Sequence, residues 1–274
     1  MIRAVPVLSA RLAADVREML VEQREYRELL VRLTLRDLLL RYKQTLMGVG
    51  WAIFMPLVNT AVFSVIFTRV APIDTGLPYP LFAYSGLVAW NFFASSQRFA
   101  VVSLTSNTSL VTKVYCPREV FPFSAILVSL VDFAVASLVL VALMVYYHVG
   151  VGSALFFLPV VVVVHVIFTA GVGLLLAMGN LFYRDVKYLF EIVLAVWMFA
   201  TSVVYPVDQI GGRLGAVLML NPMTPIIDAY RATLLHNQLP AAGPFLGAAA
   251  VAVVLLGVSW LCFHRAEFQF AENI

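Results

Sequence analysis

The sequence predicts an all-α integral membrane protein with six transmembrane helices, an N-terminal amphipathic interface helix and periplasmic re-entrant gate helices. Three observations support this fold class. The 274 residues are 62% hydrophobic and 12% charged, whereas soluble globular domains carry about a quarter charged residues. Residues 1–45 hold 15 of the 33 charged residues. The rest of the chain contains uncharged windows of about 20 residues, the length that crosses a membrane.

The chain therefore divides into two parts. Residues 1–45 are expected to form a cytoplasmic amphipathic interface segment, and residues 46–274 a six-helix transmembrane domain. We place span boundaries at glycines, prolines and charge clusters. The predicted spans are residues 48–68, 80–97, 121–147, 154–182, 188–207 and 245–263.

The front segment reads as one helix from Ser9 to about Tyr42, because no proline or glycine interrupts it. Glu28 stands four residues before Arg32, the spacing of a helical ion pair. An apolar side opposite these charges predicts a helix in the membrane interface; a simple topological anchor is the alternative. That side carries Leu29, Leu30, Leu33 and Leu40.

Residues 208–243 separate the fifth and sixth spans and contain only the short apolar piece Leu214–Leu220. A piece of this length suits a re-entrant helix better than a crossing. We expect two short helices that dip into the membrane, with Pro222 and Pro225 forcing the turn between them. A surface loop is the alternative.

Basic residues set the orientation. With a cytoplasmic N-terminus, the inner side receives 14 Lys or Arg and the outer side three, with Arg98 inside the second span. This asymmetry follows the positive-inside rule, and six spans then put both termini in the cytoplasm. The highly charged N-terminus predicts no signal peptide. A net charge of +3 is too small to indicate a nucleic-acid partner.

Catalytic motifs are missing from the sequence: there is no P-loop, HExxH, GxSxG or DxD pair. The two cysteines have no metal-like spacing, so no metal site is expected. His165 lies well inside a predicted span, where a lone histidine most often makes an interhelical hydrogen bond. The sequence predicts a membrane protein that is not an enzyme.

Asp132 is the most costly residue in the predicted spans, because a carboxylate within the membrane needs a partner. Arg98 lies nearest in depth on the neighbouring span. We predict a buried ion pair between Arg98 and Asp132. A proton relay is the alternative, although relays usually use several such groups in series.

Four motifs, in order along the chain, resemble those of the type-2 ABC exporter permeases that export O-antigen and teichoic acid polysaccharides. They cover roughly residues 30–265. The motifs are Leu35-Arg36-Asp37 with Arg41-Tyr42-Lys43-Gln44, Gly48 and Trp51; Lys113-Val114-Tyr115 with Pro117-Arg118-Glu119; Asn180-Leu181-Phe182-Tyr183-Arg184-Asp185-Val186; and Tyr205-Pro206 with Asn221-Pro222-Met223-Thr224-Pro225 and Tyr230-Arg231.

The resemblance implies a homodimeric permease in the bacterial inner membrane, paired with two copies of a separate ATPase. ATP and Mg would bind to that ATPase, with no cofactor on this chain. The cargo would be a polysaccharide on undecaprenyl diphosphate, moved from cytoplasm to periplasm. The first and fifth spans would line a passage between the two copies.

The resemblance also implies roles for single residues. ATPase coupling would involve Lys113, Tyr115, Pro117, Arg118, Glu119, Arg184 and Asp185. The lipid diphosphate would first meet Arg36, Arg41 and Lys43, for which plain positive-inside anchoring is an equal alternative. The channel and gate would include Trp51, Phe54, Tyr205, Asn221, Pro222 and Arg231. Asp37, four residues before Arg41, is a candidate partner for it along the helix.

Three rival functions remain at this point. A permease of the same class could export small amphipathic compounds or drugs; the aromatic content and the motif from Arg41 to Trp51 favour glycan. A membrane enzyme transferring sugar phosphate needs clustered carboxylates for a metal ion, and only Glu119 and Asp185 are present, in different loops. A non-transporting structural subunit would not need re-entrant helices.

Overall fold

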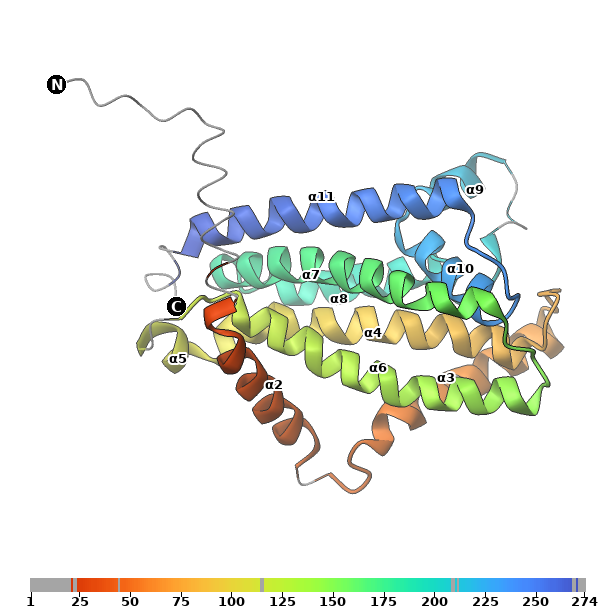
Figure 1. Ribbon diagram of the computed structural model, residues 1–274, viewed down its shortest axis with the longest axis horizontal. Coiled ribbons are helices and arrows are strands. Elements are labelled where there is room, and N and C mark those ends of the chain that lie inside the picture. Colours follow the sequence, from red (N-terminus) through yellow and green to blue (C-terminus); the bar gives the residue numbers. More distant parts are fainter. Residues whose placement is uncertain are drawn as a thin grey trace.

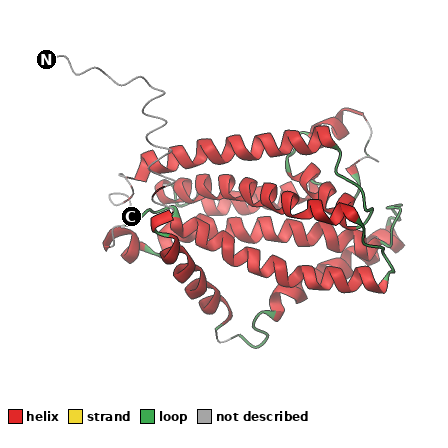
Figure 2. Cartoon of the chain, in the orientation of Figure 1, coloured by secondary structure: helices red, strands yellow, loops and turns green. Residues whose placement is uncertain are grey.

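The computed structural model describes residues 21, 24–43, 45–113, 116–207, 210, 212–267 and 270. Among these residues all regular secondary structure is helical (Figure 2). The all-α prediction is therefore confirmed for the described part of the chain.

The long helical segments run along the long axis of the molecule, except for residues 50–70, which are inclined to it (Figure 1). The start of α2 (Arg27–Tyr42), the short helix α5 (Thr108–Lys113) and the end of α11 (Ala242–Ala266) lie at one end. The short helices α9 (Gly212–Met219) and α10 (Met223–Leu234) lie at the other. The long segments are α3 (Gly50–Val65, continued by the π-helix Ile66–Val70), α4 (Tyr79–Ser106), α6 (Val120–Tyr146), α7 (Leu158–Phe182, preceded by the 3-10 turn Ser153–Phe157), α8 (Val186–Phe199) and α11 (Ala242–Ala266).

Four of the described helical segments are long and apolar enough to cross a membrane: Gly50–Val70, Val120–Tyr146, Ser153–Phe182 and Ala242–Ala266. Each coincides with a predicted span. The helix α4 is long enough to cross a membrane, but it is less apolar because it carries polar side chains. Other helices cover these side chains. The helix α8 has 14 residues, fewer than the roughly 20 that a crossing needs. The count of six spans therefore stays a prediction.

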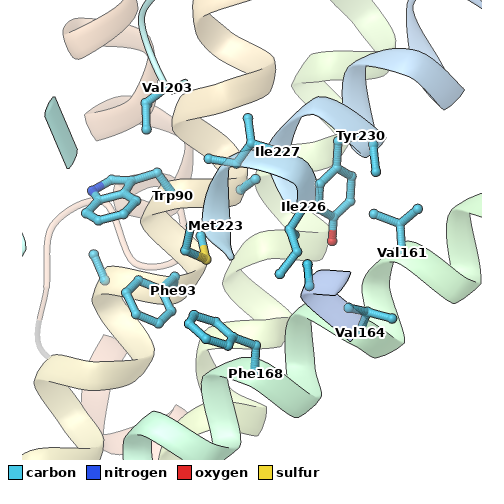
Figure 3. Packing of buried hydrophobic residues seen from close by; sticks show 14 of the residues in the cluster. Trp90, Phe93, Val161, Val164, Phe168, Val203, Met223, Ile226, Ile227 and Tyr230 are labelled. Carbon is cyan, nitrogen blue, oxygen red and sulfur yellow. The ribbon is translucent and has the colours of Figure 1, made fainter. Parts of the chain in front are cut away.

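The helix α4 lies at the centre of the bundle, and most of its side chains are buried. It contacts α3, α6, α7, α8 and α10. Trp90 and Phe93 of α4 pack with Phe168 of α7 and with Met223 and Ile226 of α10 (Figure 3). Because its surroundings are protein, α4 tolerates the polar side chains that a lipid-facing helix would avoid.

The front helix is described from Arg27 to Tyr42 as α2, and it packs against α6. The predicted ion pair between Glu28 and Arg32 is present at 2.6 Å. Leu33 is buried and packs in one cluster with Leu29 and Leu30 against the bundle, while the place of this helix in the membrane interface stays a prediction. Leu40 is 61% exposed, so it does not extend the apolar side. Residues 9–20, 22 and 23 of the expected helix lie outside the described residues.

The helices α2 and α3 diverge from the bundle and meet at the short segment between them, forming a V (Figure 1). The arms of the V contact α6 and α4. The C-terminal end of α2 therefore lies beside the middle of α6, instead of beside its first turn.

Two short helices, α9 (Gly212–Met219) and α10 (Met223–Leu234), follow α8. Their helical character matches the sequence prediction, while their depth in a membrane stays a prediction. Pro222 immediately precedes α10, as expected for a helix start. Pro225 lies inside the first turn of α10, so the prediction that it shapes the turn is wrong; a proline is tolerated there because first-turn N–H groups have no helical partner.

Candidate functional site

A cavity of about 560 Å³ lies between the V of α2 and α3 and the helices α4 and α6. Its size falls in the range of small-molecule sites, roughly 300–1,000 Å³. Aromatic walls come from Trp51, Phe92, Phe99 and Phe133. The polar side chains around it are Arg41, Tyr42, Asn59, Asn91, Ser95, Arg98, Ser129 and Asp132.

Asp132 lies at the α6 wall of this cavity and binds two residues of α2. Arg41 Nη1 donates to one carboxylate oxygen and the Tyr42 hydroxyl donates to the other. The side chains of Arg41 and Asp132 are 15% and 17% exposed. The Arg41 guanidinium also stacks on Phe99, with Cζ 3.7 Å from the ring centroid. These contacts neutralise the carboxylate that the sequence singled out.

The predicted pair between Arg98 and Asp132 is therefore wrong. Asp132 is twelve residues into α6, about 18 Å from its start, and the end of α2 reaches that depth. Arg98 instead binds Glu191 of α8, with Nε 3.0 and 3.1 Å from the two carboxylate oxygens. The expected pairing of Asp37 with Arg41 along α2 is wrong as well, because Arg41 turns toward α6.

Arg36 and Lys43, predicted to meet the lipid diphosphate, lie outside the cavity lining. Arg36 binds Asp37 and also Asn107, with Nη2 2.8 Å from Oδ1 of that residue. Asp37 in turn accepts a hydrogen bond of 2.8 Å from Ser124 of α6. These contacts attach α2 to the end of α4 and to the first turns of α6, whereas Lys43 is exposed.

The segment between α5 and α6 is tied to the end of α11. The Arg118 backbone N–H and Nη1 each lie 3.0 Å from Glu267 Oε1. Glu119 is fully buried and accepts a hydrogen bond of 3.0 Å from Trp260 Nε1. Burial raises the pKa of Glu267 above its ordinary value, with Glu119 adding to the effect. Pro117 is also buried.

Among the predicted coupling residues, Lys113, Arg184 and Asp185 are exposed at this end of the molecule. Tyr115 lies outside the described residues. Arg118 and Glu119 face inward, so they hold the loop in place through α11. The sequence could not separate these two groups because all of them lie in polar loops.

At the opposite end, Arg231 of α10 is buried at 4% exposure. Its Nη1 lies 2.5 Å from the Ser202 carbonyl oxygen, and its Nη2 lies 2.7 Å from that of Val203. The guanidinium stacks on Phe82 of α4, 3.6 Å from the ring centroid. Arg231 thereby fixes the segment after α8 against α4.

Asn221 makes a second connection at this end. Its Oδ1 accepts hydrogen bonds from Trp197 Nε1 at 2.9 Å and from the Met223 N–H at 3.1 Å. Its Nδ2 donates to the Ala200 carbonyl at 2.9 Å. The Tyr205 hydroxyl donates to the Phe199 carbonyl. Asn221 therefore joins α8 to the start of α10, whereas Tyr205 connects the segment after α8 to the end of α8.

Three further positions complete the comparison with the sequence predictions. Trp51 and Phe54 are 43% and 44% exposed and pack edge to face at the start of α3. His165 is buried, and its Nδ1 lies 3.3 Å from the Tyr230 hydroxyl oxygen, which confirms the predicted interhelical hydrogen bond. The sequence analysis did not identify Glu191 as the partner of Arg98. The available signal was that Glu191 lies in an apolar helix, where a carboxylate needs a partner.

Comparison with known proteins fits this architecture. Residues 28–235 match the family model described as ABC-2 type transporter. The chain is 33% identical over 254 residues to the O-antigen export system permease protein RfbA of Myxococcus xanthus, covering 91% of this chain and 96% of the relative. It is 27% identical over 248 residues to an O-antigen export system permease protein RfbA of Klebsiella pneumoniae, covering 89% and 94%. The chain is a multi-pass membrane protein that belongs to the ABC-2 type transporter family.

Proposed function

We propose that this chain is the permease subunit of an ABC exporter for O-antigen-class polysaccharide carried on undecaprenyl diphosphate. Transport runs from the cytoplasm to the periplasm across the bacterial inner membrane, with both chain termini cytoplasmic. The observation that carries the proposal is the 33% identity to an O-antigen export permease over 96% of that relative. Similarity along the whole length supports a shared transport role.

The working unit is a homodimer with two copies of an ABC ATPase, which binds ATP and Mg on a separate chain. Family membership supports the ATPase partner. About half of the side chains of α3 and α8 are exposed in the single chain, so these two helices are free to meet a second copy. Between two copies, they would border the glycan passage.

The exposed side chains Lys113, Arg184 and Asp185 form the proposed ATPase contact. ATP binding can bias the permease only through contacts that differ between two states. The buried connections of Arg118 and Glu119 to α11 make this end a rigid unit, so a push on the exposed residues moves the attached helices together.

The lipid diphosphate is proposed to meet the chain at the C-terminal end of α2. Of the three predicted residues, Arg41 has the strongest structural support, because it lines the cavity. Arg36 already binds Asp37 and Asn107, and Lys43 is exposed outside the lining. Arg36 fits an anchoring role at the membrane surface, whereas Lys43 lies at the depth of Tyr42 and Asp132.

Export of small amphipathic compounds by the same class of permease is the second candidate, favoured by the largely apolar cavity walls. The test is to purify the chain with its ATPase subunit and reconstitute both in proteoliposomes. We expect undecaprenyl-linked glycan to change the rate of ATP hydrolysis and amphipathic drugs to leave it unchanged. The opposite pattern would favour the drug exporter, and failure of any ATPase to copurify would overturn the permease assignment.

A further inference from the structure

Building on the proposed function, we infer that Arg41 and Arg98 together bind the diphosphate of the lipid carrier. Asp132 and Glu191 then act as counter-ions that give way when the diphosphate arrives. This assignment adds Arg98 to the headgroup site and gives the two acids a positioning role.

The two arginines reach one cavity from different helices. Both line it, and the Arg41 guanidinium rests on the ring of Phe99, the residue that follows Arg98 on α4. The two cations therefore lie at the same level of α4. Arg98 is eight residues before the end of α4, about 12 Å from the inner end of that helix. A headgroup entering from the inner membrane surface reaches this depth.

Each arginine keeps donors for a ligand. The contacts of Arg98 with Glu191 use Nε, and the contact of Arg41 with Asp132 uses Nη1. Guanidinium groups bind phosphate oxygens in a fork of two parallel hydrogen bonds. Two guanidiniums match the two phosphates of a diphosphate, whereas a single phosphate would leave one of them with its carboxylate.

The counter-ions explain how the site exists without ligand. An arginine without a partner within a membrane is costly, and each arginine here has one acid. The pair of Arg98 and Glu191 is half-exposed, at 51% and 50%, so a ligand that enters the cavity can reach it. A diphosphate carries more charge than one carboxylate and replaces it readily.

Exchange of partners would also change contacts between helices. Arg41 connects α2 to α6 through Asp132, and Arg98 connects α4 to α8 through Glu191. When the diphosphate takes both arginines, the two ion pairs open, while Tyr42 still donates to Asp132. Occupancy of the site is thereby signalled to α8, one of the helices proposed to border the passage.

The neutral part of the cavity suits the sugar next to the diphosphate. Asn59, Asn91 and Ser95 lie beside aromatic walls. Amide and hydroxyl groups bind sugar hydroxyls, and aromatic faces cover the apolar face of a sugar ring. The full site therefore takes a glycosyl diphosphate with its lipid outside the cavity.

The test measures binding of farnesyl diphosphate, farnesyl monophosphate and inorganic pyrophosphate to the purified permease–ATPase complex, with the ATPase nucleotide site filled by a non-hydrolysable ATP analogue. We expect the lipid diphosphate to bind most tightly. Arg98→Gln should weaken it about tenfold or more, the usual loss for a hydrogen bond to a charged group. Arg69→Gln, an exposed arginine at the opposite end, is the matched control and should leave affinity unchanged.

The counter-ion role predicts that replacing an acid raises the affinity, whereas replacing an arginine lowers it. Glu191→Gln should tighten farnesyl diphosphate binding severalfold, a result that simple loss of structure would not give. Asp132→Asn should act alike, and Glu191→Gln keeps the test valid where Asp132→Asn fails to fold. Unchanged affinity in Arg98→Gln, or weaker binding in Glu191→Gln, would overturn the inference. Equal binding of inorganic pyrophosphate would instead assign the site to a free anion.

Failure here is distinct from failure of the proposed function. If undecaprenyl-linked glycan still stimulates ATP hydrolysis while the Arg98 variant binds normally, the exporter assignment stands and only this site is wrong. If neither glycan nor farnesyl diphosphate has any effect, both are wrong.

Discussion

Replacing Arg231 by Met should destabilise the end of the bundle that holds α9 and α10 by about 3 kcal/mol. Arg231 is buried, and its guanidinium binds the backbone carbonyls of Ser202 and Val203 while stacking on Phe82. Methionine fills similar apolar space without the donors. The two carbonyls that follow α8 would then lose their partners.

The magnitude combines two contributions that stabilise the folded state with one that opposes them. Hydrogen bonds from a charged donor contribute about 1.5–3 kcal/mol each, so the two short ones total about 3–6 kcal/mol. A desolvated cation over an aromatic ring adds about 2 kcal/mol. Removing a buried charge relieves a desolvation cost of several kcal/mol. The net loss is therefore about 3 kcal/mol.

The assay is reversible unfolding of the detergent-solubilised chain, followed by tryptophan fluorescence, because Trp197 lies beside this region. Arg213→Met is the matched control: Arg213 is exposed on α9 at the same end, and its loss should change stability by less than about 0.5 kcal/mol. Equal stability of Arg231→Met and wild type would refute the reasoning that this arginine holds the segment after α8.

Three more predictions concern a close backbone contact, a buried acid and an exposed loop. A Cβ at Gly86 would lie 2.3 Å from the Val203 carbonyl oxygen, so Gly86→Ala should lower the unfolding temperature in a thermal melt, and an unchanged melt would contradict this close approach. Burial raises the pKa of Glu267, so the folded state binds its proton more tightly than the unfolded state does. The stability of wild type relative to Glu267→Gln should therefore fall as pH rises from the ordinary glutamate pKa through the raised one; a difference that is flat with pH would argue against burial. Lys113→Glu should lower glycan-stimulated ATP hydrolysis without changing stability, whereas Arg118→Gln should lower stability first; identical effects on both readouts would remove the distinction between the exposed contact and its buried support.

Much of the fold follows from composition and spacing. The apolar windows located the long helices because a helix that crosses lipid must be apolar along its length. The short apolar piece before Asn221 was correctly expected to be helical. Hydropathy alone does not fix the number of spans. The helix α4 carries polar side chains that the protein covers, and α8 ends after 14 residues.

The candidate site was harder to predict, because it depends on where α2 ends. The positions of Asp132 and Arg98 along their predicted spans indicated a similar depth in the membrane. Ion pairing also depends on which helices face each other, and the sequence alone does not show this. Once Arg41 enters beside α6, Asp132 is neutralised and Arg98 turns to Glu191. Arg118 and Glu119 show the same limit: sequence gives their loop, while only packing against α11 shows that they face inward.

Transbilayer movement of the cargo is the most direct test of the exporter assignment. The permease and its ATPase would be reconstituted in liposomes containing fluorescent undecaprenyl-diphosphate-linked glycan, oriented by protease protection, with a membrane-impermeant glycosidase reporting glycan on the far side. We predict ATP-dependent exposure of glycan on the face opposite the ATPase, abolished by an ATPase-dead partner. Glycan that stays on the ATPase face in the presence of ATP, while the complex hydrolyses ATP, would contradict the assignment.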